Sequence, residues 1–218
     1  MRLGKNVAWS TLVAAAGAMV MLFAAQGAMA AGITGTKHDF SAKLWGSGST
    51  ALGQICVVCH APHNNNNAAG SLLWNHTVTA ATFTMYSSPT LTATGLAVGA
   101  GSVSKLCLSC HDGTVAVDSF GGTGTAGTVQ SITGGAKVGP DLSNDHPIGF
   151  AYNAALATAD GGLKTPASTS FVDAASKVPL FAANLECASC HNVHDNANAP
   201  FLRIANTGSA LCITCHNK

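Results

Sequence analysis

The chain has 218 residues, of which only 9% are charged, and its formal net charge is +1 at pH 7. This balance excludes a strongly basic surface of the kind that binds nucleic acid. Aromatic residues make up 6% of the sequence and glycine occupies 24 positions, so the chain is poorly supplied for an ordinary hydrophobic core.

Residues 1–30 have the pattern of a secretory signal peptide. Arg2 and Lys5 precede an apolar stretch that ends in the small residues Ala28-Met29-Ala30. A membrane anchor is the alternative, but the apolar run is short and is followed by a cleavage pattern rather than by positive charge. We therefore expect cleavage after Ala30 and a secreted protein. The remaining residues, 31–218, are expected to form a single domain with eight basic and nine acidic residues.

The motif C-x-x-C-H occurs four times in this domain. Its members are Cys56, Cys59 and His60; Cys107, Cys110 and His111; Cys187, Cys190 and His191; and Cys212, Cys215 and His216. The two thiols of one motif can add to the vinyl groups of one haem, and the adjacent imidazole can then ligate its iron. A zinc site built from two C-x-x-C pairs is the alternative, but zinc leaves the four histidines unexplained. The sequence therefore predicts four covalently bound haems c.

The fold predicted from this pattern is mostly coil with short helices and few strands, wrapped around a core of stacked haems. Helices capped by small polar residues are expected to lead into three motifs, at residues 50–60, 102–111 and 207–216. Short strands are expected around residues 77–85 and 171–172, and exposed loops at 64–67 and 121–135.

Five further histidines could supply a second axial ligand to iron: His38, His63, His76, His146 and His194. Met85 is the only methionine after residue 30, so two histidine ligands at each of the four haems, with one histidine to spare, is the economical prediction. Iron with six ligands has no open position for a substrate. We therefore expect electron transfer at low potential, and no enzymatic activity.

Sequence spacing restricts how these histidines pair. His63 follows His60 by three residues, and His194 follows His191 by the same interval. Two imidazoles so close along the chain cannot lie on opposite faces of one haem. His63 and His194 are therefore expected to ligate haems other than the one bound by their own motif, which would bring neighbouring haems together.

Several short motifs recur in a recognisable order: His38-Asp39-Phe40-Ser41, residues 55–63, Leu73-Trp74-Asn75-His76, residues 106–113, Asp145-His146-Pro147, residues 187–194 and residues 211–216. In this order they resemble the small tetrahaem outer-surface cytochromes of metal-reducing bacteria, of the cytochrome E type. The resemblance implies a head-to-tail homopolymer, an extracellular cytochrome nanowire whose stacked haems carry electrons from other redox cytochromes to extracellular acceptors. It also implies that His63 ligates a haem of the neighbouring subunit.

Two other functions stay open at the level of sequence. One is a soluble, monomeric periplasmic tetrahaem electron shuttle, which would share the motifs but not the assembly. The other is a multihaem reductase with one five-coordinate haem, which the surplus of histidines disfavours. Polymerisation depends on the shape of the surface, so the sequence separates the filament from the shuttle poorly.

Overall fold

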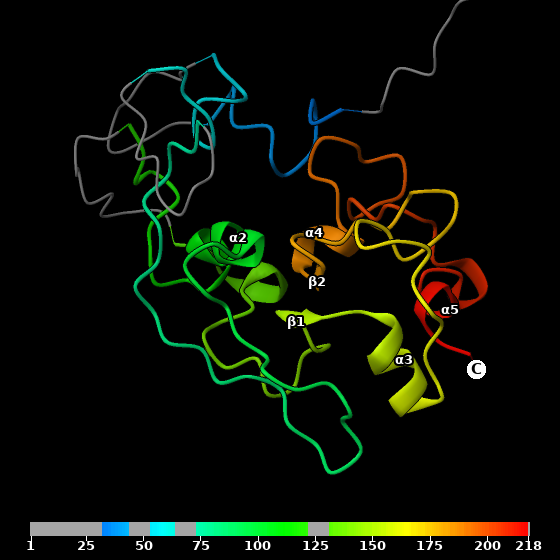
Figure 1. Cartoon of the computed structure of the whole chain (residues 1–218). Helices are drawn as coiled ribbons and strands as arrows, with labels where there is room; N and C mark the ends of the chain where they lie inside the picture. Colours follow the sequence, from blue (N-terminus) through cyan, green and yellow to red (C-terminus); the bar gives the residue numbers. More distant parts are fainter. Residues whose placement is uncertain (1–31, 44–52, 64–72, 122–130, 218) are drawn as a thin grey trace, which may run out of the picture. The chain divides into compact units, whose positions relative to one another are not determined.

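The computed structural model describes residues 32–43, 53–63, 73–121 and 131–217 (Figure 1). All of them fall within the unit formed by residues 31–218. The predicted signal peptide at 1–30 and the predicted loop at 64–67 lie outside the described residues. Within the described ranges, no helix has the length and apolar composition that crossing a membrane requires.

Most of the described chain is coil, as predicted. The helices are α2 (Val103–His111), α3 (Ala154–Asp160), α4 (Cys187–Cys190) and α5 (Cys212–Cys215), with short 3-10 turns at Gly134–Ala136 and Thr207–Ser209. Two strands, β1 (Phe150–Ala151) and β2 (Asn184–Leu185), form a small antiparallel sheet. Figure 1 shows α2 beside α4, and these two helices pack against each other.

The small sheet lies in the larger of two buried apolar clusters. Phe150 pairs with Leu185 across the sheet, and both side chains are buried. They pack in one cluster with Tyr152, Val172, Val178 and Leu180, and Cys215 of the fourth motif borders it. The second cluster centres on Val58, inside the first motif, and Val117. Each cluster therefore adjoins a cysteine motif. The buried apolar side chains thus support the first and fourth motifs.

Helix α2 confirms the helix predicted at residues 102–111, but not its predicted cap. Ser102 makes no capping hydrogen bond with its side chain; its hydroxyl donates to Glu186 Oε2 at 2.6 Å. The same carboxylate oxygen accepts the backbone N–H of Ser104 at 3.2 Å. The first turn of α2 is therefore capped by a residue far along the chain, which local sequence patterns do not reveal.

The helix predicted at residues 50–60 is wrong for its described part, residues 53–60, which forms turns. Gly53 has φ of +67°, which is incompatible with a right-handed helix. At the other end, the carbonyl of Val57 accepts the Asn75 side-chain amide at 2.5 Å, and the Ala61 N–H donates to Leu73 O at 2.9 Å. In a continuing helix, the Ala61 N–H would instead have donated to the Val57 carbonyl.

The helix predicted at residues 207–216 is interrupted. Gly208 and Ser209 have φ of +61° and +62°, so the 3-10 turn and α5 form separately. The strands predicted around 77–85 and 171–172 are also wrong, because these segments make only isolated bridges, Thr84 with Asp141 and Phe171 with Pro179. Residues 122–130 of the predicted loop at 121–135 lie outside the described residues.

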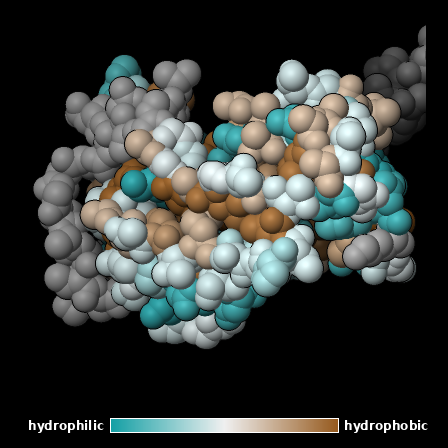
Figure 2. Space-filling view, turned by 60° about the horizontal axis from the view of Figure 1, so that its bottom comes forward, coloured by the Kyte–Doolittle hydropathy of each residue, from teal (hydrophilic) through white to brown (hydrophobic). Residues whose placement is uncertain are grey.

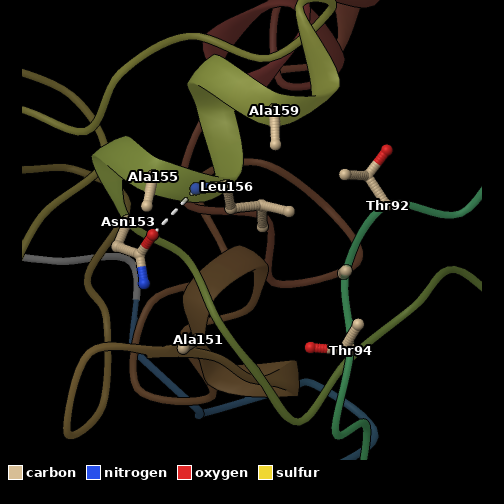
Figure 3. Close-up of a pocket in the computed structure, with 8 residues that line it drawn as sticks. Thr92, Thr94, Ala151, Asn153, Ala155, Leu156 and Ala159 are labelled. Carbon is tan, nitrogen blue, oxygen red and sulfur yellow. Dashed lines mark hydrogen bonds between the residues drawn. The ribbon is translucent and has the colours of Figure 1, made fainter.

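Helix α3 was not predicted, although both of its ends carry recognisable signals. As N-cap, the Asn153 side chain accepts the N–H of Leu156 at 2.9 Å (Figure 3). Gly161 ends the helix in the left-handed conformation with φ of 69°. Beside it lies a cavity of about 290 Å³ bordered by Ala151 and Thr94. The alanine-rich sequence of α3 lacks the apolar periodicity by which helices are usually recognised.

Candidate haem sites

Each C-x-x-C-H motif folds into a single turn. In three motifs the N–H of the histidine donates to the carbonyl of the first cysteine, at 2.8 Å for His60, 3.1 Å for His191 and 3.0 Å for His216. In the second motif the turn is the end of α2, which finishes at His111. Residues three apart on a helical turn lie on the same face. The turn therefore presents both thiols of a motif on one side, as attachment to one haem requires.

The backbone of each motif histidine is fixed by a second segment. His60 forms a bridge with Trp74, His191 with Leu202 and His216 with Leu163. His111 is fixed differently, because its carbonyl accepts the N–H of Val138 at 2.8 Å. These contacts fix the main chain at each motif histidine and leave its ring nitrogens unused.

Three motif histidines each lie beside one of the five additional histidines. The ring centres are 6.0 Å apart for His38 and His111, 6.1 Å for His60 and His194, and 6.4 Å for His146 and His216. An imidazole nitrogen binds a metal ion at about 2 Å and lies about 1.1 Å from its ring centre, so two imidazoles on opposite sides of one ion have centres about 6 Å apart. The three observed separations match this spacing.

Hydrogen bonds at Nδ1 hold several of these rings. Nδ1 of His111 lies 2.7 Å from Ala136 O, that of His146 2.9 Å from Pro147 O, and that of His191 3.1 Å from Pro200 O. A neutral imidazole that donates from Nδ1 keeps Nε2 as an acceptor. Metal-binding histidines characteristically donate their other ring N–H to such a carbonyl.

The electrostatic environment of two paired histidines favours the neutral ring. Burial lowers the pKa of His38, and the nearby His111 lowers it further. Burial likewise lowers the pKa of His60, with a smaller contribution from His194. In addition, Nδ1 of His38 is buried with no hydrogen-bond partner in the described part of the chain. A neutral imidazole is the form that ligates a metal.

The structure does not bring the remaining candidates together. In the described ranges, no other histidine ring lies against His191, and both His191 and His63 are exposed. His76 is fully buried, with Nδ1 2.8 Å from Thr77 O and Nε2 3.0 Å from Ala116 O. Its Nε2 also lies 3.4 Å from Cys110 Sγ, at the second motif. A histidine partner for His191 is therefore not supplied by the described part of one chain.

Thiols of consecutive motifs interact with one another. Burial raises the pKa of Cys59 to about 11 and that of Cys110 to about 12, and the proximity of Cys59 adds to the shift at Cys110. A hydrogen bond between Cys107 and Cys187 raises the pKa of the first and lowers that of the second. In the same way, Cys190 of the third motif interacts electrostatically with Cys212 and Cys215 of the fourth. The four motifs therefore adjoin one another in chain order.

A cavity of about 640 Å³ lies at the fourth motif, lined among others by His146, Cys215 and His216. Cofactor sites typically occupy about 300 to 1,000 Å³. Tyr86 and Phe150 contribute aromatic walls. Figure 2 shows hydrophobic residues gathered in the middle of one face of the molecule. The Cys215 thiol, the paired imidazoles of His146 and His216 and the aromatic walls of this cavity fit a covalently bound haem.

Among the described residues, no group of three or more His, Cys, Asp or Glu side chains could hold a metal ion. The histidines meet in pairs instead. A haem iron would need only such a pair of ligands from the protein, because the porphyrin would supply the others.

A family model described as a doubled CXXCH motif matches residues 180–218, which contain the third and fourth motifs. No curated protein matches the chain. The matched motif indicates covalently bound haem c and an electron-transfer function, as in multihaem c-type cytochromes.

Glu186, which immediately precedes the third motif, was not predicted from the sequence to belong to the site. Its side chain is only 3% exposed and connects α2 to α4 through the serines of both helices. A signal was present, because Glu186 is the only glutamate in the sequence and lies next to a cysteine motif.

Proposed function

We propose that the chain is an electron-transfer protein with four covalently bound haems, each ligated by two histidines. The observation that carries this proposal is the set of three histidine pairs with ring centres 6.0 to 6.4 Å apart, each joining a motif histidine to a distant one. The haem irons would supply the one-electron redox chemistry. The protein binds the cofactors, orients their ligands and leaves the iron without an open position, so no catalytic reaction is proposed.

The contacts between consecutive motifs support a continuous path. Cys59 lies near Cys110, Cys107 lies near Cys187, and Cys190 lies near Cys212. Cofactors attached at these thiols would follow one another in chain order, with Cys215 of the fourth motif bordering the larger apolar cluster. We propose that this order is the order of electron transfer, with the stacked haems taking the place of a conventional core.

We further propose that the protein is secreted and assembles head to tail into an extracellular filament. His191 lacks a histidine partner within the described part of one chain, and His63 is exposed. If His63 of one subunit ligates the third haem of the next, each subunit donates a ligand at one end and accepts one at the other. Such a contact is heterologous, and it continues as an open helix unless it closes into a ring.

Replacement of His63 tests the filament. His63→Ala leaves all eight cysteines in place, so we expect full haem content but short or monomeric species in electron micrographs of the purified protein. One haem per chain should also lose its distal ligand. Lys177→Ala is the matched control, because this side chain is exposed and belongs to no motif. Filaments of normal length from His63→Ala would refute the assignment, and a wild-type protein that stays monomeric would favour the periplasmic shuttle.

A further inference from the structure

Glu186 occupies a buried junction between the second and third motifs. It is 3% exposed, directly precedes Cys187, and lies where α2 and α4 pack against each other. The N–H of Cys187 donates to Ser104 Oγ at 2.9 Å, and Ser104 lies three residues before Cys107. The carboxylate is therefore held between the two motifs by the residues that carry them.

Its hydrogen bonds identify the group as an acceptor. Glu186 Oε2 accepts from the Ser102 hydroxyl at 2.6 Å, from the Ser104 N–H at 3.2 Å and from the Ser104 hydroxyl. The carboxylate also accepts the N–H of Ser189 in a capping box at the start of α4. Two of these donors are backbone N–H groups, which can only donate. All of the donors are neutral, so they stabilise a negative charge without cancelling it.

We propose that Glu186 places a buried negative charge between the second and third haems and lowers their reduction potentials, an inference that rests on the proposed haem-binding function. The oxidised iron carries one more positive charge than the reduced iron, so a nearby carboxylate favours the oxidised form. Burial protects this interaction from screening by salt, which weakens the effect of exposed charges. Glu186 would thus act on the irons through the electrostatic field of its carboxylate. Its hydrogen bonds would separately fix the packing of α2 on α4.

Three variants separate the charge from the packing. Glu186→Gln removes the charge and keeps the shape. Glu186→Asp keeps the charge and shortens the side chain. Asp141→Asn removes the same charge from an exposed carboxylate that accepts a hydrogen bond from Ser143, and it serves as the control.

Potentiometric titration of each purified holoprotein, followed by haem absorbance, provides the test. We expect Glu186→Gln to shift part of the four-haem titration curve to higher potential, with Glu186→Asp and Asp141→Asn close to wild type. An unshifted Glu186→Gln curve, or an equal upward shift in Glu186→Asp, would overturn the proposal. If Glu186→Gln does not retain its haems, Glu186→Asp still tests the proposal, because an upward shift in a variant that keeps the charge would refute the role of charge.

The same experiment separates this inference from the function on which it rests. Haem content and the absorption spectrum of the wild-type protein are recorded before titration. A wild-type protein without covalent haem would contradict the proposed function itself. A fully loaded wild type with an unshifted Glu186→Gln curve would contradict only the role of Glu186.

Discussion

Tyr152 joins two segments that meet at the fourth motif. Its side chain is 2% exposed, and its hydroxyl is shared between Lys164 O at 2.8 Å and Cys215 O at 3.2 Å. The N–H of Lys164 also donates to Cys215 O at 2.7 Å. Burial raises the pKa of the phenol, so it stays protonated and able to donate at neutral pH. The Tyr152 hydroxyl and the Lys164 N–H therefore together hold the Cys215 carbonyl at the fourth motif.

Removing the Tyr152 hydroxyl should lower the stability of the folded protein measurably. Tyr152→Phe keeps the ring in the apolar cluster but leaves the Lys164 and Cys215 carbonyls without this donor. An unmade buried hydrogen bond costs about 1 to 3 kcal/mol, and we expect a loss of that size in the free energy of unfolding of the holoprotein. Denaturant titration followed by far-ultraviolet circular dichroism measures it. Tyr86→Phe is the control, and an equal loss in both variants would contradict the role given to Tyr152.

At the scale of elements, the short strands and helices are held by burial and by remote caps rather than by intrinsic propensity. β1 and β2 have two residues each, and an isolated pair of such short strands is not stable in water by itself. Phe150 and Leu185 stabilise the pair because both are buried in the larger cluster. α4 and α5 are single turns whose ends coincide with the cysteines. Covalent attachment at both cysteines would fix such turns further.

Truncating Leu185 of β2 tests how much the larger apolar cluster stabilises the protein next to the third motif. Leu185 is 3% exposed and lies two residues before Cys187. We expect Leu185→Ala to lower the free energy of unfolding by about 2 to 5 kcal/mol, because the substitution leaves a cavity in the cluster. Val138→Ala, at a side chain 43% exposed, should change it little. Thermal denaturation of both variants at equal haem content makes the comparison, and similar melting temperatures would show that Leu185 is not part of a stabilising core.

At the scale of the whole molecule, the sequence predicts the haem-attachment residues better than it predicts which distant residues meet in space. The cysteines and the adjacent histidines follow from a local spacing that one turn of chain satisfies, so the sequence predicts the attachment motifs directly. The pairing of His38 with His111 could not be predicted, because it depends on how distant coil segments pack. Coil without apolar periodicity leaves few signals for such packing.

The errors in predicted structure have the same origin. Residues 53–60 form a turn because Asn75 and Leu73, from another segment, take the hydrogen bonds that a helix would use. The cap of α2 comes from Glu186, more than eighty residues away. Both are tertiary contacts, which override local propensity in a chain with so little regular structure.

Electron paramagnetic resonance of the oxidised protein, with covalent haem counted by mass spectrometry, tests most directly whether paired histidines ligate every haem. We expect four haems per chain, low-spin ferric signals only, and no rapid binding of carbon monoxide after reduction, because each iron would already hold two imidazoles. A stoichiometric high-spin ferric signal, or rapid carbon monoxide binding by the native reduced protein, would contradict this coordination.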